Sequence, residues 1–178
     1  GQFSTFTKEG ETKTPAFDLH LRSALEQVGG WDERLITSQD SDLSMRLIKE
    51  GYTLYRTPEL SVEMRRRTSL SSWYLMSHRY GFWRTKVLLK HPSRIVLREL
   101  LPLLGALFTI GLFVVNPSLS IFPLLAYASV LLFSGLYSIR KGPLHLIGVP
   151  LCLLILHIGF TLGLLDGCVR KGRASRDR

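Results

Sequence analysis

The 178-residue sequence contains only two cysteines, and no CxxC pair. Cys152 lies inside an apolar run and Cys168 at its end, so we expect reduced thiols rather than a disulfide framework. The phosphate-loop patterns GxxxxGK[ST] and GxGxxG are absent, as are HExxH and any Cys/His set with metal spacing. No serine or histidine stands in a recognised nucleophile motif. These absences exclude the common sequence signatures of metalloproteases, P-loop enzymes and serine hydrolases.

Acidic residues are missing from residues 64–98, which hold 9 Lys or Arg. Residues 1–63 carry 7 Lys/Arg against 11 Asp/Glu, and residues 99–178 carry 7 against 3. The formal net charge of +9 is therefore concentrated in one block directly before the apolar half of the chain. A basic block beside apolar segments favours anionic lipid headgroups as the partner. Nucleic acid, the other usual partner of a basic protein, is not expected.

Three segments near the C-terminus lack charge: residues 100–115, 119–138 and 144–165, with 16, 20 and 22 residues. A membrane-spanning helix needs about 20 predominantly apolar residues. Asn116 and Pro117 separate the first two segments, which predicts a helical hairpin. Soluble core helices are the alternative, but so small a chain has too little polar surface to cover three of them.

The third apolar segment contains Gly159, Gly163 and Gly167 at four-residue spacing, which predicts close association of helices within the chain or between chains. His157 is predicted to be a hydrogen-bonded packing residue in the same segment. The membrane topology contains a conflict. If the basic block is cytoplasmic, three crossings put the basic tail at residues 170–178 outside, against the positive-inside rule. Either the third segment is re-entrant or the rule is broken once.

The first 64 residues predict a small α/β arrangement. Apolar residues recur at helical spacing over residues 17–28, and Gly29 is expected to end that helix. Ser38 is expected to cap a second, short helix, and residues 52–55 and 60–64 are predicted strands.

A third helix is predicted over residues 70–90, capped by Thr68 or Ser69. It combines basic residues with tryptophan and tyrosine, a mixture that favours the membrane interface over an ordinary surface helix.

The carboxylates Asp40 and Asp42 are the main candidates for chemistry. The sequence Asp-Ser-Asp is a D-x-D pair, which in other proteins holds a divalent cation because hard cations prefer oxygen ligands. At the start of a helix, however, the second carboxylate turns away from the first. Acidic residues in a first helical turn are also explained by the helix dipole alone, and this reading stays open beside the catalytic one.

The order of several motifs resembles the C-terminal half of a family 2 glycosyltransferase, with a GT-A fold and of the kind that makes succinoglycan-type exopolysaccharides. The motifs are residues 28–33 (VGGWDE), 39–47 (QDSDLSMRL), 51–52 (GY), 67–70 (RTSL) and 79–83 (RYGFW), followed by the three apolar segments.

The resemblance implies a role for each matching residue. Asp40 corresponds to the general base that deprotonates the acceptor hydroxyl, which attacks a nucleotide-activated sugar with inversion. Asp42 is expected to steady the loop. Residues expected on the acceptor and diphosphate side are Gln39, Asp42, Arg67, Arg79, Tyr80 and Trp83.

Two positions depart from the family pattern: Met76 replaces a frequent glutamine, and Met64-Arg65 replaces a frequent His or Tyr before the RTSL stretch. The resemblance also implies that the nucleotide-binding half, with its own metal-binding D-x-D, is missing here. A divalent metal, Mg or Mn, is therefore expected in the full-length enzyme but not in this chain, which alone is expected to lack sugar transfer.

The sequence thus predicts an α/β fragment followed by an amphipathic interface helix and an α-helical membrane bundle. The expected division is residues 1–69 for the GT-A part, 70–98 for the interface helix and basic linker, 99–169 for the membrane helices, and 170–178 for the tail. The predicted function is transfer of a sugar from a nucleotide-sugar donor to a lipid-linked or polysaccharide acceptor by a multi-pass inner-membrane protein, on the cytoplasmic side. The main alternative is a non-enzymatic membrane adaptor. A lipid-modifying transferase has no supporting motif.

Overall fold

A computed structural model describes residues 9–13, 18–59 and 68–171. Contacts divide the chain into two compact units. Of the described residues, those before position 60, residues 83–95 and Lys171 form what we call the N-terminal unit, and residues 68–82 and 96–170 form the helical unit. The described part is mostly helical, and its strands form one two-stranded sheet.

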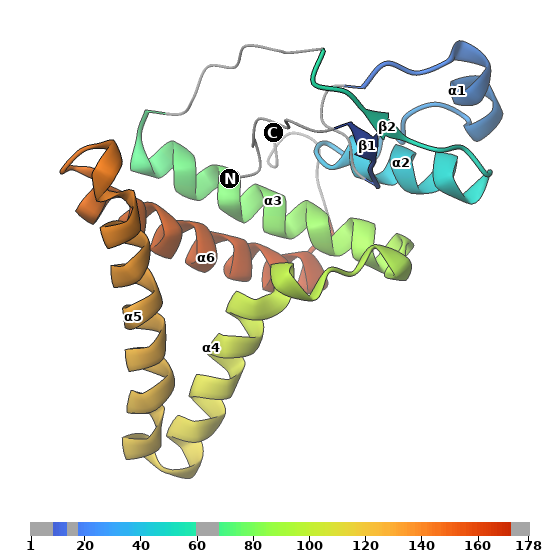
Figure 1. Cartoon of the computed structure of the whole chain (residues 1–178). Coiled ribbons are helices and arrows are strands. Elements are labelled where there is room, and N and C mark those ends of the chain that lie inside the picture. The colour runs from blue at the N-terminus through green and yellow to red at the C-terminus, as the bar shows by residue number, and fades with distance from the viewer. Residues whose placement is uncertain (1–8, 14–17, 60–67, 172–178) are drawn as a thin grey trace. The chain divides into compact units, whose positions relative to one another are not determined.

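The N-terminal unit contains two short helices and this small antiparallel sheet (Figure 1). Its elements are β1 (Gly10–Glu11), α1 (Arg22–Val28), α2 (Gln39–Lys49) and β2 (Tyr55–Arg56). The prediction was partly wrong here. The first helix begins only at Arg22, the strand expected from position 52 begins at Tyr55, and β1 lies before residue 17, where no element was predicted. The predicted strand at residues 60–64 lies outside the described residues.

The core of the N-terminal unit lies between α1 and α2. Leu43 and Leu47 of α2 are 0% and 2% exposed and pack with the buried Ala24 of α1. Burying a leucine side chain contributes about 1.5–3 kcal/mol, so these two leucines fix α2 against α1. Partly buried apolar residues extend the cluster: Leu25, Val28, Tyr52 and Leu54. Gly29 ends α1 in the left-handed conformation, with φ 75°, as predicted.

Helix α3 (Leu70–Lys90) has the predicted bounds. The hydroxyl of Ser69 accepts the backbone N–H of Ser72 at 3.2 Å, which confirms one of the two expected caps. The helix contributes to both units: residues 70–82 belong to the helical unit and residues 83–90 to the N-terminal unit. A short 3-10 turn, η1 (Pro92–Arg94), follows it.

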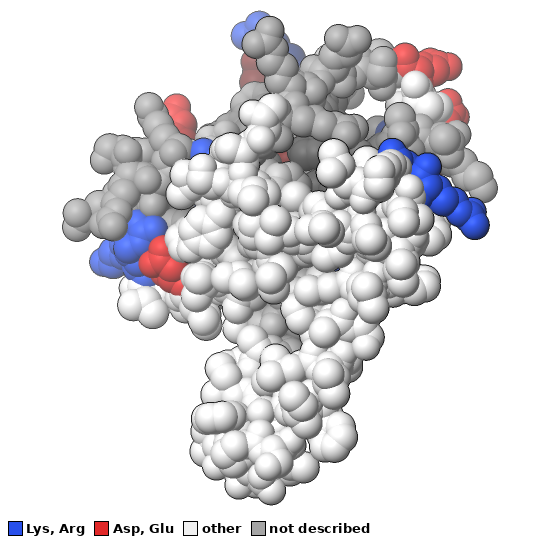
Figure 2. Space-filling view, turned by 90° about the vertical axis from the view of Figure 1, so that its left-hand side faces the viewer, with Lys and Arg blue, Asp and Glu red and all other residues white. Residues whose placement is uncertain are grey.

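Three further helices of the helical unit are long and apolar enough to span a membrane. They are α4 (Leu97–Val115), α5 (Ile121–Ser138) and α6 (His145–Val169), joined by the 3-10 turns η2 (Pro117–Ser120) and η3 (Ile139–Lys141). At the predicted break, the Asn116 side chain accepts the backbone N–H of Ser118 at 3.0 Å. Figure 2 shows that the lower lobe, which is the far end of the α4–α5 hairpin, exposes no charged residue.

Helix α6 packs against both α5 and α3. A Cβ added at Gly135 of α5 would lie 2.4 Å from the carbonyl oxygen of Leu146, so these two helices touch at their backbones. Farther along, the Tyr127 hydroxyl and His157 Nδ1 are hydrogen bonded at 2.8 Å, which confirms the predicted packing role of His157. Gly159 and Gly163 contact α3, and Gly167 is buried. The small-residue pattern is therefore used within the chain.

Candidate functional site

The loop between α1 and α2 leads into the candidate site with an unusual backbone at Ser38. This residue has φ 62°, in the left-handed region, and its side chain makes no capping hydrogen bond. The expected serine cap is therefore wrong, because such a cap requires an extended backbone at that position. Instead, Oδ1 of Asp40 accepts the backbone N–H of Ser41 at 2.8 Å.

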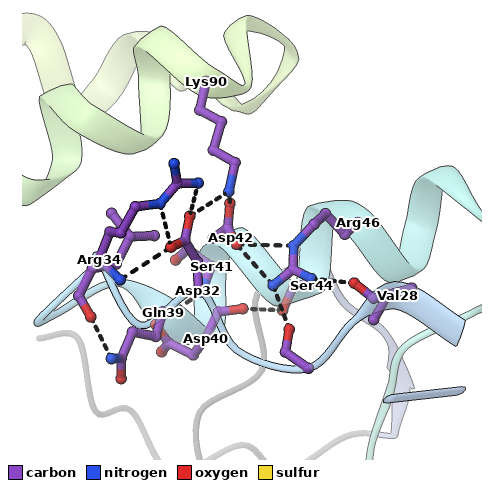
Figure 3. Close-up of polar contacts among 12 residues, drawn as sticks. Val28, Asp32, Arg34, Gln39, Asp40, Ser41, Asp42, Ser44, Arg46 and Lys90 are labelled. Carbon is purple, nitrogen blue, oxygen red and sulfur yellow. Dashed lines mark hydrogen bonds and ion pairs between the residues drawn. The ribbon is translucent and has the colours of Figure 1, made fainter. Parts of the chain in front are cut away.

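The two carboxylates of the D-x-D pair lie in opposite environments. Asp42 is 0% exposed, whereas Asp40 is exposed. Residues two positions apart on a helix do not face each other, so the two groups cannot share one cation as first-turn neighbours. Across the described ranges of the chain, no three His, Cys, Asp or Glu side chains gather as a metal site requires. Figure 3 shows how each carboxylate is used.

Asp42 is surrounded by three basic side chains. Its Oδ1 lies 2.6 Å from Lys90 Nζ and 2.8 Å from His91 Nε2, and its Oδ2 accepts from Arg46 Nε at 2.9 Å. Burial would raise the pKa of Asp42, but hydrogen bonds from Lys90 and His91 and the charges of Arg46 and Lys90 outweigh it, so the pKa is lowered. Asp42 is therefore a buried, neutralised anion and not a free proton acceptor.

Asp32 extends this ion network into the loop. Its carboxylate accepts from Arg34 at 2.9 Å and from Lys90 at 2.9 Å. Hydrogen bonds from Arg34 and then from Lys90 hold the pKa of Asp32 well below its usual range. Burial would lower the pKa of Lys90, but bonds to Asp42 and Asp32 raise it. One ammonium group thus joins the loop, α2 and the end of α3 (Figure 3).

Arg46 connects α2 to the end of α1. Its guanidinium donates to the carbonyl oxygens of Val28 at 2.6 Å and Gly30 at 2.7 Å while it pairs with Asp42. The carbonyls at a helix C-terminus have no partner within the helix, and a basic side chain is one way to satisfy them. The arginine of the QDSDLSMRL motif therefore fixes the glycine turn relative to the first turn of α2.

A second, unpredicted group lies close to Asp40. His20 Nε2 is 3.5 Å from Asp18 Oδ2, both side chains are 9% exposed, and the His20 ring meets the Trp31 ring edge-on at 5.9 Å. Burial raises the pKa of Asp18, His20 lowers it, and the charge of Asp40 raises it, with a net rise. Asp40 is therefore within electrostatic reach of this pair. The only available signal was the Asp-x-His spacing, hidden in a segment interpreted as helix.

The remaining predicted residues are distributed between the two units. Gln39 donates from its amide to the carbonyl oxygen of Leu35 in the N-terminal unit. Trp83 is 3% exposed and belongs to the same unit, whereas the half-buried Arg79 and Tyr80 belong to the helical unit. Arg67 lies outside the described residues. The catalytic and acceptor-side roles assigned to these residues stay predictions.

Comparison with known proteins adds evidence of descent. No protein-family model and no solved structure matches the sequence. The chain is 31% identical over 150 residues to the succinoglycan biosynthesis protein ExoA of Rhizobium meliloti, a match that takes in 80% of this chain and 45% of that protein.

The chain is also 35% identical over 72 residues to the pre-mycofactocin glycosyltransferase of Mycobacterium tuberculosis, covering 40% of this chain and 15% of that enzyme. The chain thus spans less than half the length of either relative. Over part of its length, the chain is a distant homologue of the succinoglycan protein ExoA and of the pre-mycofactocin glycosyltransferase.

Proposed function

We propose that this chain is the acceptor-side, membrane-attached part of an inverting glycosyltransferase with a GT-A catalytic domain of family 2. The donor is a nucleotide sugar, and the acceptor is a lipid-linked saccharide or polysaccharide at the cytoplasmic face of the inner membrane. Homology to a glycosyltransferase and to a succinoglycan biosynthesis protein supports the reaction class. Three helices of membrane-spanning length and composition support the location.

The contrast between the two carboxylates of α2 carries the proposal. Asp42 is buried and neutralised by Lys90, His91 and Arg46, whereas Asp40, on the same turn, is exposed. A general base must reach the substrate and hold no permanent partner for its proton-accepting oxygen. The Asp40 carboxylate accepts one hydrogen bond, from the backbone N–H of Ser41 to Oδ1, and among the described residues no hydrogen bond or ion pair reaches Oδ2. The backbone carbonyl of Asp40 separately accepts from Ser44 Oγ at 2.7 Å.

In this mechanism Asp40 takes the proton from the acceptor hydroxyl as that oxygen attacks the anomeric carbon. The bond from the anomeric carbon to the nucleotide diphosphate breaks at the same time, and the diphosphate leaves with its electron pair. General base catalysis of this kind contributes about 10²–10⁴-fold. Asp42 acts through position: its ion pairs hold the first turn of α2, and with it the backbone that carries Asp40.

The divalent metal expected for the whole enzyme does not fit the described residues of this chain. Asp42 is committed to basic partners. The charge of Asp40 reaches the carboxyl group of Asp18, but among the described residues no three His, Cys, Asp or Glu side chains gather as a metal site requires. We therefore assign no step to a metal held by α2.

Substitution of Asp40 tests the proposed function in the full-length protein. Membranes that contain the Asp40→Asn variant should lose transfer of labelled sugar from the nucleotide donor to the lipid fraction by about 10²–10⁴-fold. The matched control is Glu26→Gln, which removes another exposed carboxylate, on α1, and should keep activity. Transfer by Asp40→Asn at the level of this control would remove Asp40 from the mechanism.

A further inference from the structure

Contacts between α3 and α6 follow α6 over most of its length. Near one end, the indole N–H of Trp73 donates to the carbonyl oxygen of Cys152 at 2.9 Å. Farther along α6, a Cβ added at Gly163 would lie 2.1 Å from the carbonyl oxygen of His78. Such contact between backbones is the reason for glycine at this position, and it holds the two helices as one pair.

The pair continues to the other end of α6. His78 Nε2 lies 3.6 Å from Asp166 Oδ2, and the Arg170 guanidinium lies 4.5 Å from the centre of the Phe82 ring. The two helices therefore run parallel, because the contacts go from Trp73 with Cys152 to Phe82 with Arg170. Figure 1 shows α6 running beside α3, whereas α4 and α5 leave α6 at a steep inclination. The orientation of α6 in a membrane therefore follows that of α3.

Helix α3 cannot cross a bilayer. It carries four Lys or Arg residues, each of which costs about 2.5–3.5 kcal/mol at the centre of a membrane helix. Its end is also held by the N-terminal unit, because Lys90 and His91 pair with Asp42. Residues 18–59, before α3, belong to that same unit. The end of α3 is thus held by a unit whose described residues include no helix of membrane-spanning length, which places α3 at the membrane surface.

The surface of α6 agrees with this orientation. Its residues of 39% exposure or more include a row spaced three, four or seven apart: Ile147, Leu151, Ile158, Leu162, Leu165 and Val169. This spacing puts the row on one face of the helix. The glycine face is covered by α3, and α6 has four buried residues where α4 has none. A helix with one apolar face open and the opposite face covered is suited to lie half immersed at the acyl-chain boundary.

We propose that α6 lies in the membrane surface beside α3, with its exposed apolar row against the lipid acyl chains, and that only α4 and α5 cross the bilayer. The proposal depends on the membrane location in the proposed function but not on Asp40 or on catalysis. It resolves the topology conflict: two crossings return the chain to the side of the basic block, so the basic tail is also cytoplasmic, as the positive-inside rule requires.

Cysteine labelling of the full-length protein in intact cells tests the topology. In a background with Cys152→Ser and Cys168→Ser, one variant carries Ser118→Cys in η2 and the other Lys171→Cys after α6. A maleimide that cannot cross membranes should label the Ser118→Cys variant before lysis and the Lys171→Cys variant only after lysis. Labelling of the Lys171→Cys variant in intact cells, or none of the Ser118→Cys variant, would overturn the proposal.

A second measurement avoids the cysteine substitutions. Fusions of green fluorescent protein and of alkaline phosphatase to the C-terminus of the unmutated chain should give fluorescence and no phosphatase activity, because phosphatase is active only outside. Active phosphatase at this position would show a third crossing. Neither readout depends on sugar transfer, so a failed topology and a failed catalytic assignment are distinguished.

Discussion

Replacement of Asp42 by asparagine should destabilise the N-terminal unit strongly, although the two side chains have nearly the same shape. The carboxylate is 0% exposed and lies 2.6–2.9 Å from three basic groups. Removal of one member of a buried ion pair typically costs 3–5 kcal/mol, because the charge left behind has no partner. The side chains of Lys90 and Arg46 are 35% and 21% exposed and can turn partly toward water. We therefore expect the low end of that range, about 3 kcal/mol.

Thermal unfolding of the detergent-solubilised protein, followed by circular dichroism, measures this loss. For a unit of this size 1 kcal/mol corresponds to about 4–8 °C, so the Asp42→Asn variant should melt more than 10 °C below the wild type by this rough scale. Asp40→Asn is the matched control, because its carboxylate is exposed and its loss should change stability by less than about 0.5 kcal/mol. Equal melting of the two variants would refute the argument that the buried ion network holds α2.

Three further predictions concern pH and packing. Folding lowers the pKa values of Asp32 and Asp42. The contribution of these carboxylates to the free energy of unfolding should therefore be complete above the unfolded pKa of about 3.9 and lost as the pH falls through the folded values. Denaturant titrations at pH values from 7 to 2 would detect this loss. The pH dependence from Asp18 has the opposite sign, because its raised pKa stabilises the fold only at low pH and this contribution is lost as the pH rises. The Asp18→Asn variant should therefore be more stable than wild type at pH 7, and this gain should vanish near pH 3. A variant less stable than wild type at pH 7 would contradict this reasoning. Gly163→Leu should cost about 3 kcal/mol because a backbone oxygen blocks its Cβ, whereas Gly148→Leu, on the same helix with open space, should melt close to wild type.

The helices could be predicted because their signals are local. Uncharged runs located α4 to α6, Ser69 and Lys90 bound a helix of the predicted length, and Gly29 ended α1. The sheet could not be found in the same way, because Gly10 pairs with Arg56 from far along the chain and each strand has only two residues. Strands this short carry no periodic pattern.

The site was predicted in outline and missed in detail. Asp40 and Asp42 were recognised from a motif, but nothing in the sequence connects Asp42 with Lys90 and His91, which follow it by 48 and 49 positions. Their meeting depends on the path of the whole chain, and buried ion pairs leave no periodic signature. The left-handed backbone at Ser38 was missed because serine before a helix ordinarily predicts an extended, capping residue.

The sharing of α3 between the two units restricts how the protein can be shortened. A version that stops before Leu70, to remove every apolar helix, would also lose Lys90 and His91 and leave Asp42 with Arg46 as its remaining partner. A version that keeps α3 but omits α6 would expose the face on which Ser77 and Gly81 now contact α6. A C-terminally shortened protein made to express the Asp40 region in soluble form therefore either loses Lys90 and His91 from the ion network around Asp42, or keeps α3 with its α6-facing side exposed.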